Sequence, residues 1–279
     1  HPEIKEMIRG LFIPEEGCEW GSFDYSAQEP RWLMHYASGT PAVKDNEKVI
    51  EIVNQYRNAD LDFHQMVADI ADVDRSVAKT INLGIMYGMG IGKLANVMGG
   101  ISFEEAKELR NEYDEVPFIR AMTSSVMEVA SLRHEIRTLM GRKCRFPMRE
   151  LRGYNRDSSS LIHADKLEER WRGILEIPEE EREKGWKSFE PDRYQVAFTY
   201  KALNRLIQAS SADQTKMAMK MCADHGYLPM LTVHDELCFS IKNDDQVKEI
   251  KDLMENCIPD LQIPSRIDVG TGTNWGNAK

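Results

Sequence analysis

The chain has 279 residues, of which 42% are hydrophobic, so it can fill the core of one large domain or two modest ones. Its 36 lysines and arginines are outnumbered by 46 acidic residues, giving a formal net charge of −10, so a polyanion such as nucleic acid must be met by a local basic patch. No stretch approaches the roughly 18 consecutive apolar residues of a membrane span, and the five cysteines form no C-x-x-C pair, which argues against a thiolate zinc site and a disulfide framework. We therefore expect a globular protein of the reducing cytoplasm with no membrane partner. The start without methionine predicts the C-terminal part of a longer polypeptide.

A strand followed directly by a helix is predicted near the N-terminus. Cys18–Asp24 is rich in aromatic residues and follows a cluster of turn residues, which is typical of a strand. The next residues predict a helix that reaches Tyr36, with Ser26 as its cap and Pro30 in its first turn. A carboxylate, Asp24, therefore ends a strand just before a helix.

Helical periodicity dominates the middle of the chain, from Asn46 to about Ala130, with breaks at Gly99-Gly100 and near Pro117. Strand signals return between Arg137 and Pro147. The apolar pattern then becomes poor, and acidic residues outnumber basic ones in residues 168–193. This predicts a solvated, mobile insertion at about residues 148–192.

The C-terminal third alternates between helices and strands. The predicted elements are a long helix over Arg193–His225 ended by Gly226, two short strands in Leu228–Lys242 meeting at His234-Asp235, a helix over Asp244–Cys257 and a strand near Arg266–Val269.

Asp24 and Asp235 are thus both predicted at strand ends, where a turn exposes the side chain. Each alone is more often a turn or cap residue. Together on one sheet they would form a rigid pair of carboxylates, which is what Mg²⁺ bound to phosphate oxygens requires.

A third constellation lies on one predicted helix, where Arg75, Lys79, Leu83 and Tyr87 follow one another at intervals of four residues. Such side chains drift only about 40° around the axis per step, so they form one stripe. Two cations, an apolar side chain and a ring suit a nucleoside triphosphate. The alternative is a helix with a solvated basic end and a buried apolar end. The glycines of residues 88–92 follow a helix rather than a strand, which argues against a dinucleotide-binding loop.

Together these features resemble the polymerase domain of family A DNA polymerases, which include bacterial DNA polymerase I and many phage replicative enzymes. The family motif D-Y-S-x-x-E-x-R matches residues 24–31. A second motif, R-x-x-x-K-x-x-x-(aromatic)-x-x-x-Y-G, matches residues 75–88 except at Leu83, and V-H-D-E matches residues 233–236. All three occur once and in the family's order. Weaker matches are Leu139–Lys143, Asn204–Asp213, Asp62-Phe63-His64 and Asn274-Trp275.

The resemblance implies an α+β fold: the palm of a right-hand polymerase, an antiparallel sheet with helices, together with helical fingers. The palm would comprise residues 1–40 and 130–279, with the insertion at about 148–192, and the fingers residues 41–129. The family's thumb and exonuclease domains do not fit in these residues. We expect them upstream, on the same polypeptide or on a partner chain.

The resemblance also implies roles for single residues. Asp24, Asp235 and the Tyr25 carbonyl would hold two Mg²⁺ ions, for which Mn²⁺ can substitute, and Lys79 would donate a proton to the leaving pyrophosphate. Glu29 would exclude a ribose 2′-hydroxyl. The implied nucleotide-binding residues are Arg75, Lys79, Leu83, Tyr87, His64, Glu29 and Tyr25, with Arg9 near the phosphates, and those for primer–template DNA are Asn204, Gln208, Arg142 and His234.

Residues 131–156 supply the local positive charge that DNA requires, with eight basic residues against two glutamates. Several positions depart from the family pattern. Leu83 replaces the usual Phe or Tyr beneath the incoming sugar, where a Tyr hydroxyl is understood to fill the place of a missing 3′-hydroxyl. Ala27-Gln28 and Pro30 indicate a phage-like member, and Tyr200 and Ala209 replace an Arg and a Gly expected near DNA.

Template-directed DNA synthesis from deoxynucleoside triphosphates is the function that these residues favour. Two alternatives stay open: a non-catalytic DNA-binding or assembly module descended from a polymerase, and another metal-dependent phosphoryl transferase such as a nuclease. The intact set of Asp24, Asp235, Arg75 and Lys79 argues against the first, and the helical stripe argues against the second.

Overall fold

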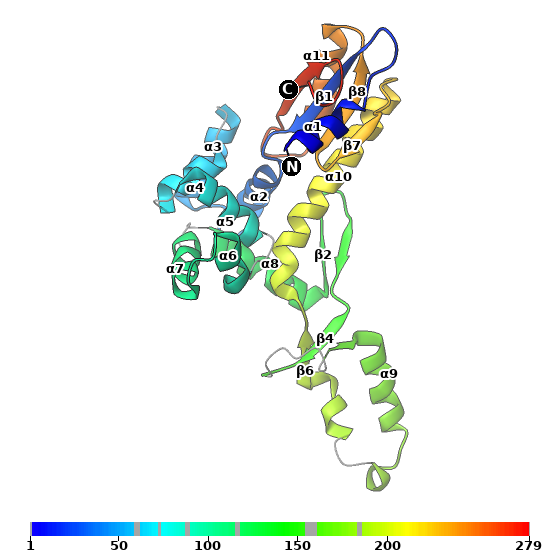
Figure 1. Ribbon diagram of the computed structural model, residues 1–279. Coiled ribbons are helices and arrows are strands. Elements are labelled where there is room, and N and C mark those ends of the chain that lie inside the picture. The colour runs from blue at the N-terminus through cyan, green and yellow to red at the C-terminus, as the bar shows by residue number, and fades with distance from the viewer. Residues whose placement is uncertain are drawn as a thin grey trace. The chain divides into compact units, whose positions relative to one another are not determined.

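The computed structural model describes residues 2–58, 62–71, 74–86, 90–114, 118–153, 161–182 and 186–278. These residues form helices and three small antiparallel sheets (Figure 1). Packing divides the chain into two compact units: unit 1 comprises residues 1–78 and 207–279, and unit 2 comprises residues 79–206. The divisions fall inside α5 (Arg75–Met86) and α10 (Ala202–Asp224). Packing therefore groups the residues differently from the expected palm and fingers, which stay a prediction.

Unit 1 is built on a four-stranded sheet in which β1 lies between β8 and β9 (Figure 1). The strand order is β7 (Leu231–Val233), β8 (Glu236–Ile241), β1 (Glu19–Tyr25) and β9 (Ile267–Gly272), and every neighbouring pair is antiparallel. Alternate residues of β1 are buried, as Phe23 is, and Phe23 meets Phe239 of β8 edge to face at 5.5 Å. The strands predicted near both aspartates are confirmed.

Helix α11 (Asp244–Glu255) covers this sheet against β8 and β9. It starts where the Asn243 side chain accepts a hydrogen bond from the N–H of Gln246 at 3.0 Å, which satisfies one N–H at the helix start. Ile250 and Met254 are its buried residues, one turn apart. The predicted helix over 244–257 is thus confirmed to within two residues.

Gly21 of β1 leaves no room for a side chain. A Cβ atom built there would lie 2.5 Å from Ile241 Cγ1 and 2.9 Å from Phe23 Cε2. We expect Gly21→Ala to lower the free energy of unfolding by about 1–3 kcal/mol, because both neighbours belong to a filled core. Gly39→Ala is the control, since a Cβ there meets no atom within 4 Å. Urea unfolding of both variants tests this, and equal stabilities would contradict it.

Helix α2 (Gln28–Gly39) is tied to α10 by polar contacts along one stripe. Gln28 Nε2 donates to the Ser211 carbonyl at 3.3 Å, and Trp32 Nε1 donates to Gln214 Oε1 at 2.8 Å. Because these groups are buried, the contacts fix the rotation of α2, whose N-terminus follows β1 directly.

The predicted cap of α2 is wrong. Ala27, not Ser26, occupies the N-cap position, and no side chain there makes a cap hydrogen bond. Ala27 has φ 50°, so the chain turns between strand and helix through a left-handed residue. The Ser26 carbonyl instead accepts a hydrogen bond from Arg31 Nε at 2.8 Å.

The other helices of unit 1 are short and precede or include the second motif. They are α1 (Pro2–Gly10), α3 (Glu47–Asn58) and α4 (Phe63–Ala71), followed by the start of α5. In unit 2 the chain continues through α6 (Ile91–Val97), α7 (Phe103–Asp114) and α8 (Ile119–Arg133). Gly99 and Gly100, at φ 86° and 82°, form the predicted break, whereas Pro117 lies outside the described residues. Among the helices that are described, none is long and apolar enough to cross a bilayer.

The strand signals of residues 137–147 correspond to a hairpin, and the segment after it is folded. The remaining elements of unit 2 are β2 (Glu135–Arg137), β3 (Lys143–Arg145), β4 (Met148–Leu151), β5 (Ile162–His163), α9 (Ala164–Leu175) and β6 (Tyr194–Val196). β4 pairs with both β5 and β6, and the ring of Trp171 stacks on that of Trp186 at 5.6 Å. The segment predicted as an insertion thus carries helices and strands in its described residues, and most side chains of α9 are exposed, as the predicted solvation requires. Its mobility stays a prediction. The helix predicted from Arg193 begins only at Ala202, because β6 takes up the residues before it.

Candidate active site

A row of carboxylates crosses three strands of the sheet of unit 1. Asp24 of β1 pairs with Glu236 of β8 on one side and with Asp268 of β9 on the other. Residues directly opposite each other on antiparallel strands share one face of the sheet. Asp235 directly precedes Glu236 in the chain, so it lies in the turn before β8, the strand adjacent to the one that carries Asp24.

Asp235 is held by a two-residue turn. Val233 of β7 pairs with Glu236 of β8, and His234 and Asp235 connect the two strands. His234 has φ 58°, a left-handed conformation that costs a non-glycine residue about 1 kcal/mol. The hairpin thus keeps a strained residue beside the carboxylates, and His234 itself is exposed there.

The negative charges of the neighbouring carboxylates repel one another. Loss of solvent and the negative charges of Asp235, Glu236 and Asp268 raise the pKa of Asp24 to about 6, against a hydrogen bond from the Tyr25 N–H that lowers it. Loss of solvent also raises the pKa of Asp235, and the charge of Glu236 adds to this. A nearby cation would relieve this repulsion.

Asp24→Asn should stabilise the metal-free protein at neutral pH but not in acid. The pKa of Asp24 in the folded protein, about 6, exceeds the ordinary value of 3.8, so the folded protein binds this proton more tightly than the unfolded chain does. The resulting stabilisation is complete below about pH 4 and is lost as the pH rises through about 6. Because the carboxyl is partly open to water, we expect a gain of only about 1 kcal/mol for the variant at about pH 8. Urea unfolding of wild type and variant in EDTA, at about pH 4 and about pH 8, tests this. A gain in the free energy of unfolding that is the same at both pH values would contradict it.

The oxygen donors of the row fit Mg²⁺. This ion takes one or two carboxylates and completes its shell with water and phosphate oxygens rather than with a full protein cage. The described residues contain no group of three or more His, Cys, Asp or Glu side chains arranged to hold a metal by themselves. Tyr25 is anchored by its hydroxyl, which donates to the Met254 carbonyl at 2.8 Å, so its backbone is fixed beside Asp24.

Two functional candidates in the row were missed from the sequence. Glu236 was noticed only as part of V-H-D-E, and Asp268 was not singled out. The strand register places both beside Asp24. The alternation in residues 267–271 was the available signal for Asp268, but alternation does not reveal which residue of another strand lies opposite.

A second cluster in unit 1 joins the start of α4 to the start of α5. Asp62 Oδ1 accepts hydrogen bonds from the N–H groups of His64 and Gln65 at 3.0 and 3.1 Å, and Asp62 Oδ2 accepts from Arg75 Nε at 2.6 Å. Loss of solvent acts to raise the pKa of Asp62, but the hydrogen bonds from Arg75, Gln65 and His64 lower it overall. Arg75 and His64, both predicted to bind nucleotide, are therefore brought together by one carboxylate.

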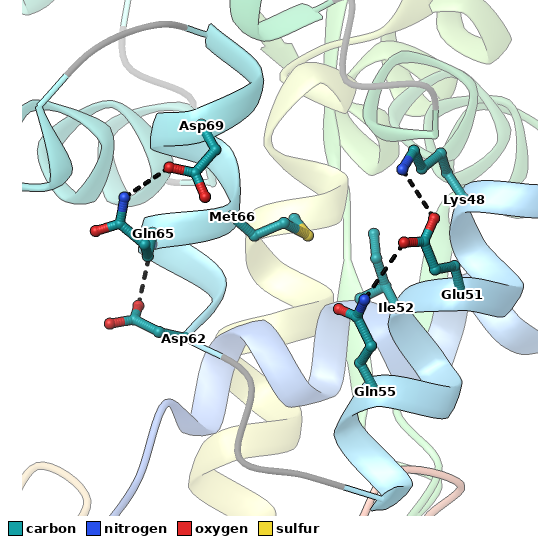
Figure 2. A pocket seen from close by; sticks show the side chains of 8 residues that line it. All are labelled: Lys48, Glu51, Ile52, Gln55, Asp62, Gln65, Met66 and Asp69. Atoms are coloured by element: carbon teal, nitrogen blue, oxygen red, sulfur yellow. Dashed lines mark hydrogen bonds and ion pairs between the residues drawn. The ribbon is translucent and has the colours of Figure 1, made fainter.

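Asp62 also lines a cavity of about 380 Å³ between α3 and α4 (Figure 2). Lys48 pairs with Glu51 at 2.8 Å on one wall, and Gln65 bonds Asp69 at 2.7 Å on the other. Three carboxylates against one lysine make this cavity unsuited to a triphosphate. It is therefore not the nucleotide site.

The other predicted residues are distributed over both units. In unit 1, Glu29 is half-buried in the first turn of α2 and Gln208 is exposed on α10. In unit 2, Lys79 is exposed on α5, Asn204 is half-buried on α10 and Arg142 is exposed between β2 and β3. The backbone of Leu83 lies in α5, whereas Tyr87 lies outside the described residues.

The fold is the α+β architecture of a polymerase domain, and the family model for DNA polymerase family A matches residues 1–277. The chain therefore belongs to DNA polymerase family A. A DNA-directed DNA polymerase of Pseudomonas phage M6 is 32% identical over 99% of this chain, and DNA polymerase DpoZ of Acinetobacter phage SH-Ab 15497 is 29% identical over 98% of it. The chain spans 41% and 40% of the lengths of these two relatives.

A solved structure agrees with these relatives. The polymerase domain of Pol1 from M. smegmatis, in complex with DNA primer-template and dNTP, matches 99% of this chain at 26% identity with a TM-score of 0.68. This chain covers 43% of that one. The family resemblance and the α+β polymerase fold predicted from the sequence are thus confirmed.

Proposed function

We propose that this protein adds deoxynucleotides to the 3′-hydroxyl of a DNA primer under the direction of a template. The observation that carries the proposal is the strand pairing of Asp24 with Glu236, which brings the Asp235 turn to the same sheet in a member of DNA polymerase family A. The five cysteines are free thiols, which supports the reducing cytoplasm expected for this activity.

In this proposal, Asp24, Asp235 and the Tyr25 carbonyl hold two Mg²⁺ ions. The ions would lower the pKa of the primer 3′-hydroxyl and neutralise charge on the triphosphate. The mutual repulsion that raises the pKa of Asp24 to about 6 supports a cationic occupant. Mn²⁺, with the same preference for oxygen ligands, is a substitute.

The protein's own cations would bind the triphosphate. Arg75 and Lys79 lie one turn apart on α5, so both side chains leave the same side of the helix. Lys79 would give a proton to the leaving pyrophosphate, since a positioned acid lowers the barrier to its departure. His64, held to Arg75 through Asp62, would add a third contact, with Leu83 and Tyr87 beneath the sugar and base. Glu29 would exclude a ribose 2′-hydroxyl.

Primer–template DNA is the proposed macromolecular partner. Asn204, Gln208, Arg142 and His234 would contact it, in the palm of residues 1–40 and 130–279, with fingers at 41–129. The primer-template held by the Pol1 neighbour supports this partner. A thumb, and with it an exonuclease domain, would be supplied by another region of the polypeptide or by a partner chain, which the coverage of 41% and 40% of the phage relatives supports.

Primer extension with Mg²⁺, by this chain alone and joined to any region that precedes it, tests the proposal. Template-dependent addition of the complementary deoxynucleotide is the expected result. Binding of primer–template without extension by either form would overturn the proposal in favour of a non-catalytic module. Degradation of the primer without addition would favour a nuclease.

The hairpin of β2 and β3 should contribute to DNA binding through charge alone. Arg137, Arg142, Lys143 and Arg145 are all exposed on it. Removing one phosphate contact reduces the slope of log affinity against log salt by about 1. We therefore expect Lys143→Ala to weaken binding of every DNA sequence alike and to lower the salt slope by about 1. Lys248→Ala, an exposed lysine of α11, is the control; equal slopes for wild type and Lys143→Ala would contradict the assignment.

A further inference from the structure

We propose that Trp275 is a positioning residue of the polymerase reaction, which fixes the carboxylate of Glu236 beside Asp24. The inference rests on the proposed function. Trp275 lies in the turn that follows β9, and its indole N–H donates to Glu236 Oε1 at 2.9 Å. A residue from the end of the chain thus reaches the carboxylate row of the sheet.

The same oxygen of Glu236 accepts hydrogen bonds from several donors. Ser22 Oγ of β1 donates to Oε1, and the Cys238 thiol approaches this oxygen at 3.5 Å. Glu236 also contributes to raising the pKa of Cys238 to about 12, although burial is the larger cause. Donors from β1, β8 and the C-terminal turn therefore fix one oxygen, and this fixes the rotation of the carboxylate.

Trp275 is itself held in place by Arg9 of α1 and by Phe12, two residues beyond the end of that helix. The guanidinium of Arg9 lies 4.4 Å from the centre of the indole ring, and Phe12 meets the ring edge to face at 5.6 Å. The backbone N–H of Trp275 donates to the Phe12 carbonyl at 3.0 Å. A cation over one face and a ring at the edge leave the indole little freedom to turn.

The tight turn after β9 makes this contact possible. A Cβ atom at Gly272 would lie 2.8 Å from the backbone carbon of Asn277, so only glycine lets the chain fold back this closely. The turn returns Trp275 to the sheet that carries Asp24 and Glu236. Because Glu236 is the cross-strand neighbour of Asp24, a rotated Glu236 carboxylate would change the charge that Asp24 experiences.

Trp275→Phe separates positioning from packing, because it keeps a ring beneath Arg9 and removes only the N–H donor. We expect the rate constant of single-nucleotide addition to fall about tenfold, the equivalent of about 1.4 kcal/mol of barrier. The dissociation constants for DNA and for the deoxynucleotide should stay unchanged. Trp171→Phe, which alters a stacked ring in unit 2, is the matched control and should keep the wild-type rate.

A double-mutant cycle with Glu236→Ala, which removes the acceptor oxygen, tests whether Trp275 acts through Glu236. If it does, the double variant should be no slower than Glu236→Ala alone, whereas independent effects would multiply. A measurement without turnover complements the cycle: in a ¹H–¹⁵N spectrum, the indole signal lost in Trp275→Phe should shift in Glu236→Gln. The indole signals of Trp32, Trp171 and Trp186 should not shift.

A wild-type rate for Trp275→Phe, multiplicative effects in the cycle, or an unmoved Trp275 indole signal in Glu236→Gln would each overturn the inference while leaving the proposed function intact. Failure of the wild-type protein, joined to any preceding region, to extend a primer would overturn the proposed function and the role of Trp275 with it.

Discussion

Replacing Asp24 or Asp235 by asparagine should lower the rate of nucleotide addition about a thousandfold while the fold stays intact. Each substitution removes a negative charge that would hold a cation at the reacting phosphate, and the loss of one electrostatic stabiliser costs about 4 kcal/mol of barrier. Neither residue fills the core: Asp24 is exposed and Asp235 is half-buried. Relief of the repulsion that raises the pKa of Asp24 to about 6 should even stabilise that variant.

Single-turnover primer extension measures this effect, and unfolding curves check the fold. Asp245→Asn is the matched control, because Asp245 is an exposed carboxylate of α11 in the same unit but outside the carboxylate row. Mn²⁺ binding, followed by electron paramagnetic resonance, should weaken in the two active-site variants only. Near-wild-type extension by Asp24→Asn or Asp235→Asn with unchanged metal binding would refute the two-metal assignment.

The strand ends that carry these aspartates could be predicted because their signals are local. Aromatic residues after a turn cluster predicted β1, and apolar residues on both sides of His234-Asp235 predicted the β7–β8 hairpin. The partners of Asp24 could not be predicted in the same way. Asp24 lies opposite Glu236 and Asp268 because of the register between strands that are more than 200 residues apart in the chain. No local sequence pattern encodes that register.

The errors in the predicted fold have the same origin. The helix predicted from Arg193 begins only at Ala202, because residues 194–196 pair with β4 as strand β6. Ser26 looked like a helix cap, but the left-handed Ala27 sets where α2 begins. In each case a contact or a backbone conformation made outside the local pattern decides the structure.

The contact between Trp275 and Glu236 illustrates how sequence and structure complement each other. Asn274-Trp275 matched the family pattern without any suggestion of a role. The hydrogen bond to Glu236 Oε1 at 2.9 Å connects that match to V-H-D-E, and the ring beneath Arg9 connects both to α1. Two matches that are distant in the sequence thus meet at one carboxylate of unit 1, and α1 supports them.

Leu83 departs from the family pattern, and it yields the second large effect. Leu83 lies four residues beyond Lys79 in α5, so in the proposed complex it lies beneath the sugar of the incoming nucleotide. The resemblance implies that a tyrosine hydroxyl here fills the place of a missing 3′-hydroxyl, and leucine has no group that can form that hydrogen bond. We therefore expect the wild-type protein to discriminate strongly against dideoxynucleotides.

Leu83→Tyr should relax this discrimination by about 10- to 100-fold, because an unpaired polar group in a closed site costs about 1–3 kcal/mol. The measured quantity is the ratio of kcat/KM for a deoxynucleotide to that for the matching dideoxynucleotide. Leu83→Phe is the control: it introduces the ring without the hydroxyl, so its ratio should stay as high as that of the wild type. A ratio that falls equally in both variants would assign the effect to ring stacking, and a ratio that falls in neither would show that Leu83 does not lie beneath the sugar.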